Sequence, residues 1–92
     1  MQASSPSPTD LTLVSYAIQS LVSAKDQEER AAVLRTAQES TTNPYALVAL
    51  VMLETAVERH TSLEEAATYL RTMGTTGRRV AAILAWTLQE LA

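Results

Sequence analysis

The sequence contains no cysteine and no phenylalanine, and it has only one tryptophan, two glycines and three prolines. The lack of cysteine excludes disulfides, thiolate metal ligands and thiol nucleophiles, and it favours a cytoplasmic location. The lack of phenylalanine leaves aliphatic side chains and alanine to form the core. Because few residues break helices, we expect long helices joined by short connections.

Long apolar runs are also missing. The longest extends from Tyr45 to Leu53, which is far too short to cross a bilayer, so we expect no membrane partner. The net charge of −3 and the pI near 5.0 argue against a general nucleic-acid binder, although they leave room for a local basic patch.

The domain organisation follows from length and composition. Ninety-two residues, 47% of them hydrophobic, are enough for one small domain. Residues 1–8 are rich in serine and proline and offer nothing to bury, so we expect a disordered tail. Residues 9–92 should form a single helical domain.

Five segments carry helical apolar spacing, and most begin with a recognisable capping residue. We expect these helices to start at Thr9 or Asp10, at Asp26, at Asn43-Pro44, at Ser62 and after Thr75-Thr76-Gly77. Gly74 should end the fourth helix. The third helix is apolar on every side in its first turns, which predicts a central element packed on several sides. The predicted fold class is all-α, a compact bundle of about five helices.

One short sequence pattern occurs twice in the chain. Residues 28–36 and 64–72 agree at two glutamates and at one alanine, leucine, arginine and threonine. Each copy is followed by a polar stretch and a long apolar helix, as expected of a repeated helical hairpin. We therefore expect two stacked hairpins, 26–60 and 62–92, with the first helix as an N-terminal cap. Leu34 and Leu70 should then occupy equivalent buried positions.

The sequence offers no catalytic constellation. His60 is the only histidine, and helical spacing places it off the face that Glu54 and Glu58 share, so it lacks partners for a metal site or for catalysis. We expect His60 to close the third helix instead. The chain has no glycine-rich phosphate loop. We therefore expect no enzyme activity, no catalytic residue, no metal and no cofactor.

Two arginines follow a polar turn before the last helix. Arg78 and Arg79, with Thr75, Thr76 and Gly77, would bring cations and free N–H groups to a helix start, where an anion or a nucleic-acid phosphate can bind. The alternative is that Arg79 reaches a carboxylate on another helix, or that both arginines lie in water.

Trp86 projects away from the apolar stripe of the last helix, on a side that we assign to Arg79, Ala82 and Ala85 as well. Tryptophan is a favoured interface residue, and small neighbours allow another helix to approach closely. These four residues are the predicted partner-binding surface. The alternative is that Trp86 fills a gap inside its own domain.

The function expected from these features is a non-enzymatic helical protein–protein interaction module. It would self-associate or act as a small adaptor or regulator through its last helix. The alternative is a small nucleic-acid-binding regulator that uses residues 75–79. Residues 62–84 look only loosely like a helix-turn-helix, because the turn is about three residues too long, and we assign no family from the sequence.

Overall fold

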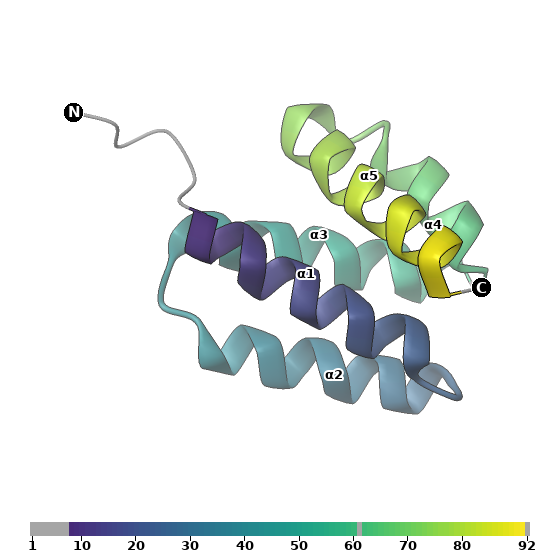
Figure 1. Ribbon diagram of the computed structural model, residues 1–92, viewed down its shortest axis with the longest axis horizontal. Helices are drawn as coiled ribbons and strands as arrows, with labels where there is room; N and C mark the ends of the chain where they lie inside the picture. Colours follow the sequence, from purple (N-terminus) through teal and green to yellow (C-terminus); the bar gives the residue numbers. More distant parts are fainter. Residues whose placement is uncertain (1–7, 61, 92) are drawn as a thin grey trace.

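The computed structural model describes residues 8–60 and 62–91, and within them it is a compact all-α bundle, as predicted (Figure 1). The predicted tail, residues 1–8, lies outside the described residues except for Pro8, which begins the first helix. The helices are α1 (Pro8–Ser23), α2 (Gln27–Ser40), α3 (Pro44–Arg59), α4 (Leu63–Leu70) and α5 (Gly74–Leu91).

The capping residues begin three of these helices as predicted. The Asp26 carboxylate accepts the N–H of Glu29 at 2.8 Å, and the Ser62 hydroxyl accepts the N–H of Glu65 at 3.3 Å. The Asn43 side chain accepts two backbone N–H groups, from Tyr45 at 2.8 Å and Ala46 at 3.1 Å. These bonds satisfy N–H groups that have no partner inside the helix.

The fourth helix is shorter than predicted, and the fifth begins earlier. α4 ends at Leu70, where a tight turn follows in which the Met73 N–H donates to the Leu70 carbonyl. Gly74 has a φ of +82°, a conformation that glycine adopts without strain, and it is already the first residue of α5. The expectation that residues 75–77 precede the last helix is therefore wrong.

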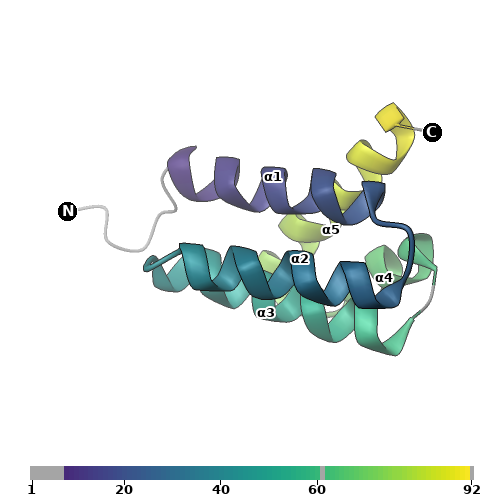
Figure 2. The same cartoon turned by 90° about the horizontal axis from the view of Figure 1, so that it is seen from below.

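The central helix of the bundle is α3, which contacts α1, α2, α4 and α5. Figure 2 shows α1 lying above α2 and α3. α1 also contacts α5, so it touches both predicted hairpins, through α2 and α3 of the first and α5 of the second. The arrangement leaves α1 and α5 side by side, which positions the surface described below.

The core is built from aliphatic side chains and alanine. Leu34 and Leu70, the leucines at matching positions of the repeated pattern, are both fully buried. The expectation that they lie in the core is confirmed. Their helices differ in length, because α2 continues to Ser40 whereas the second copy turns after Leu70. The buried residues are Val14, Ala17, Ile18, Leu21, Leu34, Ala46, Ala49, Leu50, Leu53, Ala56, Val57, Leu63, Ala66, Ala67, Leu70, Val80, Ala81 and Leu84.

α3 is packed on several sides, as predicted, but its first turns also carry exposed apolar side chains. Leu47, Val48 and Val51 are 40%, 51% and 45% exposed. The side chains of Ala49, Leu50 and Leu53, on one face of α3, are buried, whereas Leu47, Val48 and Val51 on the opposite face remain in solvent. A helix that contacts four others therefore still leaves one side exposed.

Among the helices in the described part of the chain, none combines the length and the apolar character needed to cross a membrane.

Candidate interaction surface

Helix α5 has a buried inner face and a distinct outer face. Val80, Leu84 and Thr87 are buried, and the Thr87 hydroxyl is satisfied because it donates to the Ile83 carbonyl at 2.8 Å. The exposed side chains of Arg79, Ala82, Trp86 and Glu90 follow at spacings of three, four and four residues, so they form one continuous stripe. We call these four residues the outer face of α5.

Trp86 is the largest side chain of this face and is 58% exposed. It borders a shallow groove between α1 and α5, with a volume of about 450 Å³, whose other lining residues are Thr12, Ser15, Ala82 and Ile83. The alternative expectation, that Trp86 fills a gap inside its own domain, is therefore wrong. The indole instead forms one side of an open groove.

The structure separates Ala85 from the other predicted partner-binding residues. Ala85 is half-buried and lines a different groove, between α4 and α5, together with Ala67, Arg71 and Leu88. Its direction differs from that of Trp86 by about 100°, the rotation of one helical residue. Arg79, Ala82 and Trp86 are thus the members of the predicted set that share a surface.

Arg79 reaches another helix, although not a carboxylate as considered from the sequence. Its Nη1 donates to the hydroxyl of Tyr45 on α3 at 3.4 Å. This distance is long for an N–H···O bond, whose usual length is about 2.9–3.0 Å. The guanidinium is exposed, and a carboxylate would offer it a stronger, charge-assisted acceptor.

The residues predicted to bind an anion are not arranged as a helix-start site. Because α5 begins at Gly74, Arg78 and Arg79 follow the first turn instead of lying in it. Their backbone N–H groups therefore belong to the helix interior. Gly77 is buried and packs against the Leu70 carbonyl, whereas Thr75 is exposed. The two arginine side chains are exposed and project about 100° apart.

A second exposed apolar surface lies on α3 and was not singled out from the sequence. Leu47, Val48, Val51, Met52 and Thr55 line a depression of about 310 Å³ together with Met73 from the α4–α5 turn, and none of them is charged. We call these six residues the α3 patch. The signal was present, because the run from Tyr45 to Leu53 contains more apolar residues than one helix face can bury.

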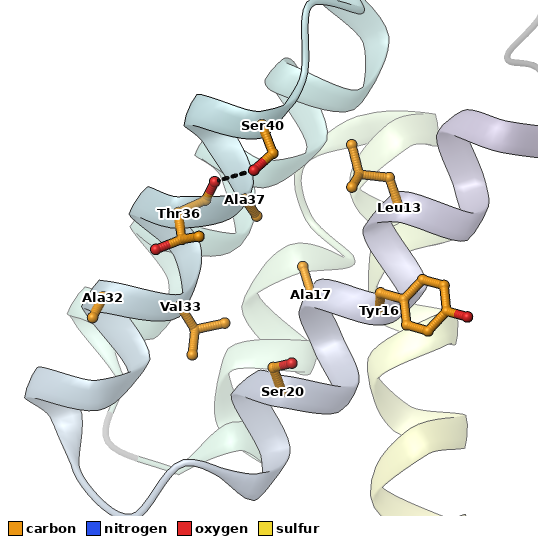
Figure 3. Close-up of a pocket in the computed structure, with 9 residues that line it drawn as sticks. All are labelled: Leu13, Tyr16, Ala17, Ser20, Ala32, Val33, Thr36, Ala37 and Ser40. Atoms are coloured by element: carbon orange, nitrogen blue, oxygen red, sulfur yellow. Dashed lines mark hydrogen bonds between the residues drawn. The ribbon is translucent and has the colours of Figure 1, made fainter.

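A third concave region, of about 370 Å³, runs between α1 and α2 (Figure 3). Leu13 and Ala17 point from α1 towards Val33 and Ala37 of α2, while the Tyr16 ring points away from α2. The Ser40 hydroxyl donates to the Thr36 carbonyl at 2.8 Å. The lining side chains are uncharged and many are small: Leu13, Tyr16, Ala17, Ser20, Ala32, Val33, Thr36, Ala37 and Ser40.

His60 closes α3, as predicted. Its backbone N–H donates to the Ala56 carbonyl at 3.1 Å. The centres of the His60 and Tyr69 rings are 5.2 Å apart, and the two ring planes are inclined at 50°. The Arg59 guanidinium lies 5.7 Å from the centre of the same Tyr69 ring. Over residues 8–60 and 62–91, no three histidine, cysteine, aspartate or glutamate side chains come together as metal ligands.

Comparison with known proteins places the chain in no family, since no protein-family model, curated protein or solved structure matches it.

Proposed function

We propose that this chain is a non-enzymatic helical module that binds a protein partner through the outer face of α5. The observation that carries the proposal is the exposure of Trp86, which is 58% accessible although it is the only tryptophan in the chain. Such a module would serve as a small adaptor or regulator.

The physical argument begins with the indole. A large aromatic side chain in water leaves apolar area that contributes free energy when a partner covers it, at about 25 cal/mol per Å². Tryptophan is also enriched among the residues that dominate binding energies. Trp86 stands beside a groove, so a partner can cover its ring and fill the groove at the same time.

The neighbours of Trp86 suit a helical partner. Ala82 is exposed one turn before Trp86, and its small side chain lets another backbone approach closely. Arg79 and Glu90 place opposite charges at the two ends of the outer face, where a polar rim fixes the orientation of a partner.

The α3 patch is also apolar and exposed, so an experiment must tell the two surfaces apart. A photo-crosslinking amino acid, benzoylphenylalanine, can replace Trp86 in one variant and Val48 in the other, in cells that make the protein. We expect protein adducts at position 86, and these should disappear when Ala82 is also changed to Glu. Adducts at position 48 without adducts at position 86 would overturn the proposal.

Nucleic-acid binding is a second outcome that the same protein can be tested for. In a mobility-shift assay with mixed DNA and RNA probes, we expect no salt-sensitive complex from a chain with a net charge of −3. A complex whose salt dependence falls by about two units in Arg78→Ala/Arg79→Ala would replace our proposal, because each lost phosphate contact removes about one unit.

A further inference from the structure

The charges on the outer face of α5 are placed in an unusual order. Arg79 lies in the second turn of the helix and Glu90 in the last turn, and both side chains are exposed. They are eleven residues apart, which is a rise of about 17 Å and a difference in direction of only about 20°. One stripe therefore has a cation at its beginning, Trp86 in between and an anion at its end.

Within a single chain, Glu90 at the end of this stripe opposes the helix dipole, because it lies in the last turn. The N-terminal end of a helix favours negative charge and the C-terminal end favours positive charge. The first turn of α5 contains no acidic residue and its last turn contains no basic one. The C-terminal end of the outer face therefore carries the opposite charge to the one that would stabilise an isolated helix.

When a second copy of the same face packs antiparallel on the first, these charges meet opposite charges. Arg79 of each copy then lies opposite Glu90 of the other, and each charge also comes near the end of the other helix that attracts it. A parallel arrangement would place like charges together. We infer that the protein partner of the outer face is a second copy of this chain, with the two α5 helices packed antiparallel around a two-fold axis that crosses the outer face midway between Arg79 and Glu90.

This inference rests on the proposed function, because it uses the same surface and names its occupant. The register that aligns Arg79 with Glu90 of the second copy also places Trp86 opposite Ile83 of that copy. Ile83 and Ala82 line the groove between α1 and α5. Each indole can therefore cover the groove of the other copy, as the symmetry of an isologous interface requires.

The surface is small, and small interfaces are typical of weak, transient association. A stable interface covers about 800 Å² on each partner, which is more than one stripe of a helix supplies. The outer face and the neighbouring groove together correspond to the small class of transient interfaces. We therefore expect a dimer with a dissociation constant on the order of micromolar, which should weaken with added salt because its ion pairs are exposed.

Sedimentation equilibrium of the full chain between about 1 µM and 1 mM tests the inference, since this range brackets the expected constant. The wild-type mass should rise with concentration from 10.0 kDa towards twice that value. Because the chain has one tryptophan, the same titration should move its fluorescence to shorter wavelength. Trp86→Ala should remain monomeric, whereas Val48→Ala, a matched change on the α3 patch, should dimerise as the wild type does.

Charge reversal tests the antiparallel geometry. Arg79→Glu alone and Glu90→Arg alone each place like charges together at two points of the dimer, and each should weaken it by about tenfold. The double exchange, Arg79→Glu/Glu90→Arg, restores both pairs and should recover most of the wild-type affinity. Two single variants that weaken the dimer with no recovery in the double exchange would overturn the antiparallel arrangement.

The outcomes distinguish this inference from the function on which it rests. A wild type that stays monomeric while position 86 still crosslinks to a different protein refutes the second copy and keeps the interaction module. A dimer that survives Trp86→Ala but is lost in Val48→Arg places self-association on the α3 patch and refutes the inference. Absence of both dimer and crosslinks at position 86 removes both proposals.

Discussion

Gly77 in α5 packs so closely on the backbone carbonyl of Leu70, at the end of α4, that there is no room for a side chain at this position. A Cβ atom placed on Gly77 would overlap that carbonyl oxygen and would lie 2.7 Å from the Cβ of Met73. The contact explains why a glycine stands at a buried position inside a helix. It also fixes the direction in which α5 leaves the α4–α5 turn, and hence where the outer face points.

We expect Gly77→Ala to destabilise the protein, although alanine is the better helix former by about 1 kcal/mol. The added methyl group meets backbone, which cannot rotate away, so the two helices must move apart at a cost of about 1–3 kcal/mol. Urea denaturation followed by circular dichroism measures the change. Ala82→Gly, on the exposed side of the same helix, serves as the control and should cost about 1 kcal/mol from propensity alone. A Gly77→Ala protein more stable than the wild type would contradict the close packing.

Leu34 and Leu70, at matching positions of the repeated pattern, should be equally important for stability. Leu34 and Leu70 are fully buried, and truncation of a buried leucine to alanine costs about 2–5 kcal/mol. A domain of this size has a total stability of roughly 5–15 kcal/mol, so Leu34→Ala and Leu70→Ala should each lower the unfolding midpoint strongly. Leu47→Ala, which removes an exposed leucine from the α3 patch, should change it far less. Equal effects of all three substitutions would contradict the assigned burial.

The starts of α2, α3 and α4 could be predicted from the sequence because each depends on a local capping bond. The interactions of Asp26 and Ser62 with their own helices involve residues three positions apart. The burial of Leu34 and Leu70 was expected from the repeated pattern, in which they occupy matching positions. The end of α4 could not be predicted in this way. Arg71 and Thr72 match Arg35 and Thr36, which continue α2 in the first copy, so the local sequence does not mark the end of α4. The contact of Gly77 with the end of α4 is tertiary and cannot be read from local spacing.

In the candidate surface too, features that depend on one helix alone could be predicted, and features that depend on neighbouring helices could not. Helical spacing correctly placed Trp86 away from the buried stripe of α5, because that direction depends on the helix alone. Ala85 was assigned to the same side but faces α4, since its direction lies between the two faces and the position of α4 decides it. The α3 patch depends on which side of α3 the other four helices occupy. A run that is apolar on every side does not contain that information.

Trp86→Ala should leave the fold intact. The side chain is mostly exposed and lies outside the core, and exposed substitutions of this kind usually change stability by less than about 0.5 kcal/mol. Thermal denaturation followed by circular dichroism, at concentrations below those of self-association, should give the wild-type melting temperature. A fall of several degrees would show that the indole supports the contact between α1 and α5. Loss of binding in this variant could not then be assigned to the outer face.

The last prediction concerns Asn43, which accepts the N–H groups of Tyr45 and Ala46 at the start of α3. Asn43→Ala removes both bonds while Pro44 still fixes the backbone, so it should lower the free energy of unfolding by about 1 kcal/mol. Asn43→Asp keeps an acceptor and should stay near the wild type, as urea denaturation would show. Because Asn43 lies outside the outer face of α5, partner binding should persist wherever Asn43→Ala stays folded. A variant with wild-type stability that no longer binds would identify residues 41–45 as part of a recognition surface.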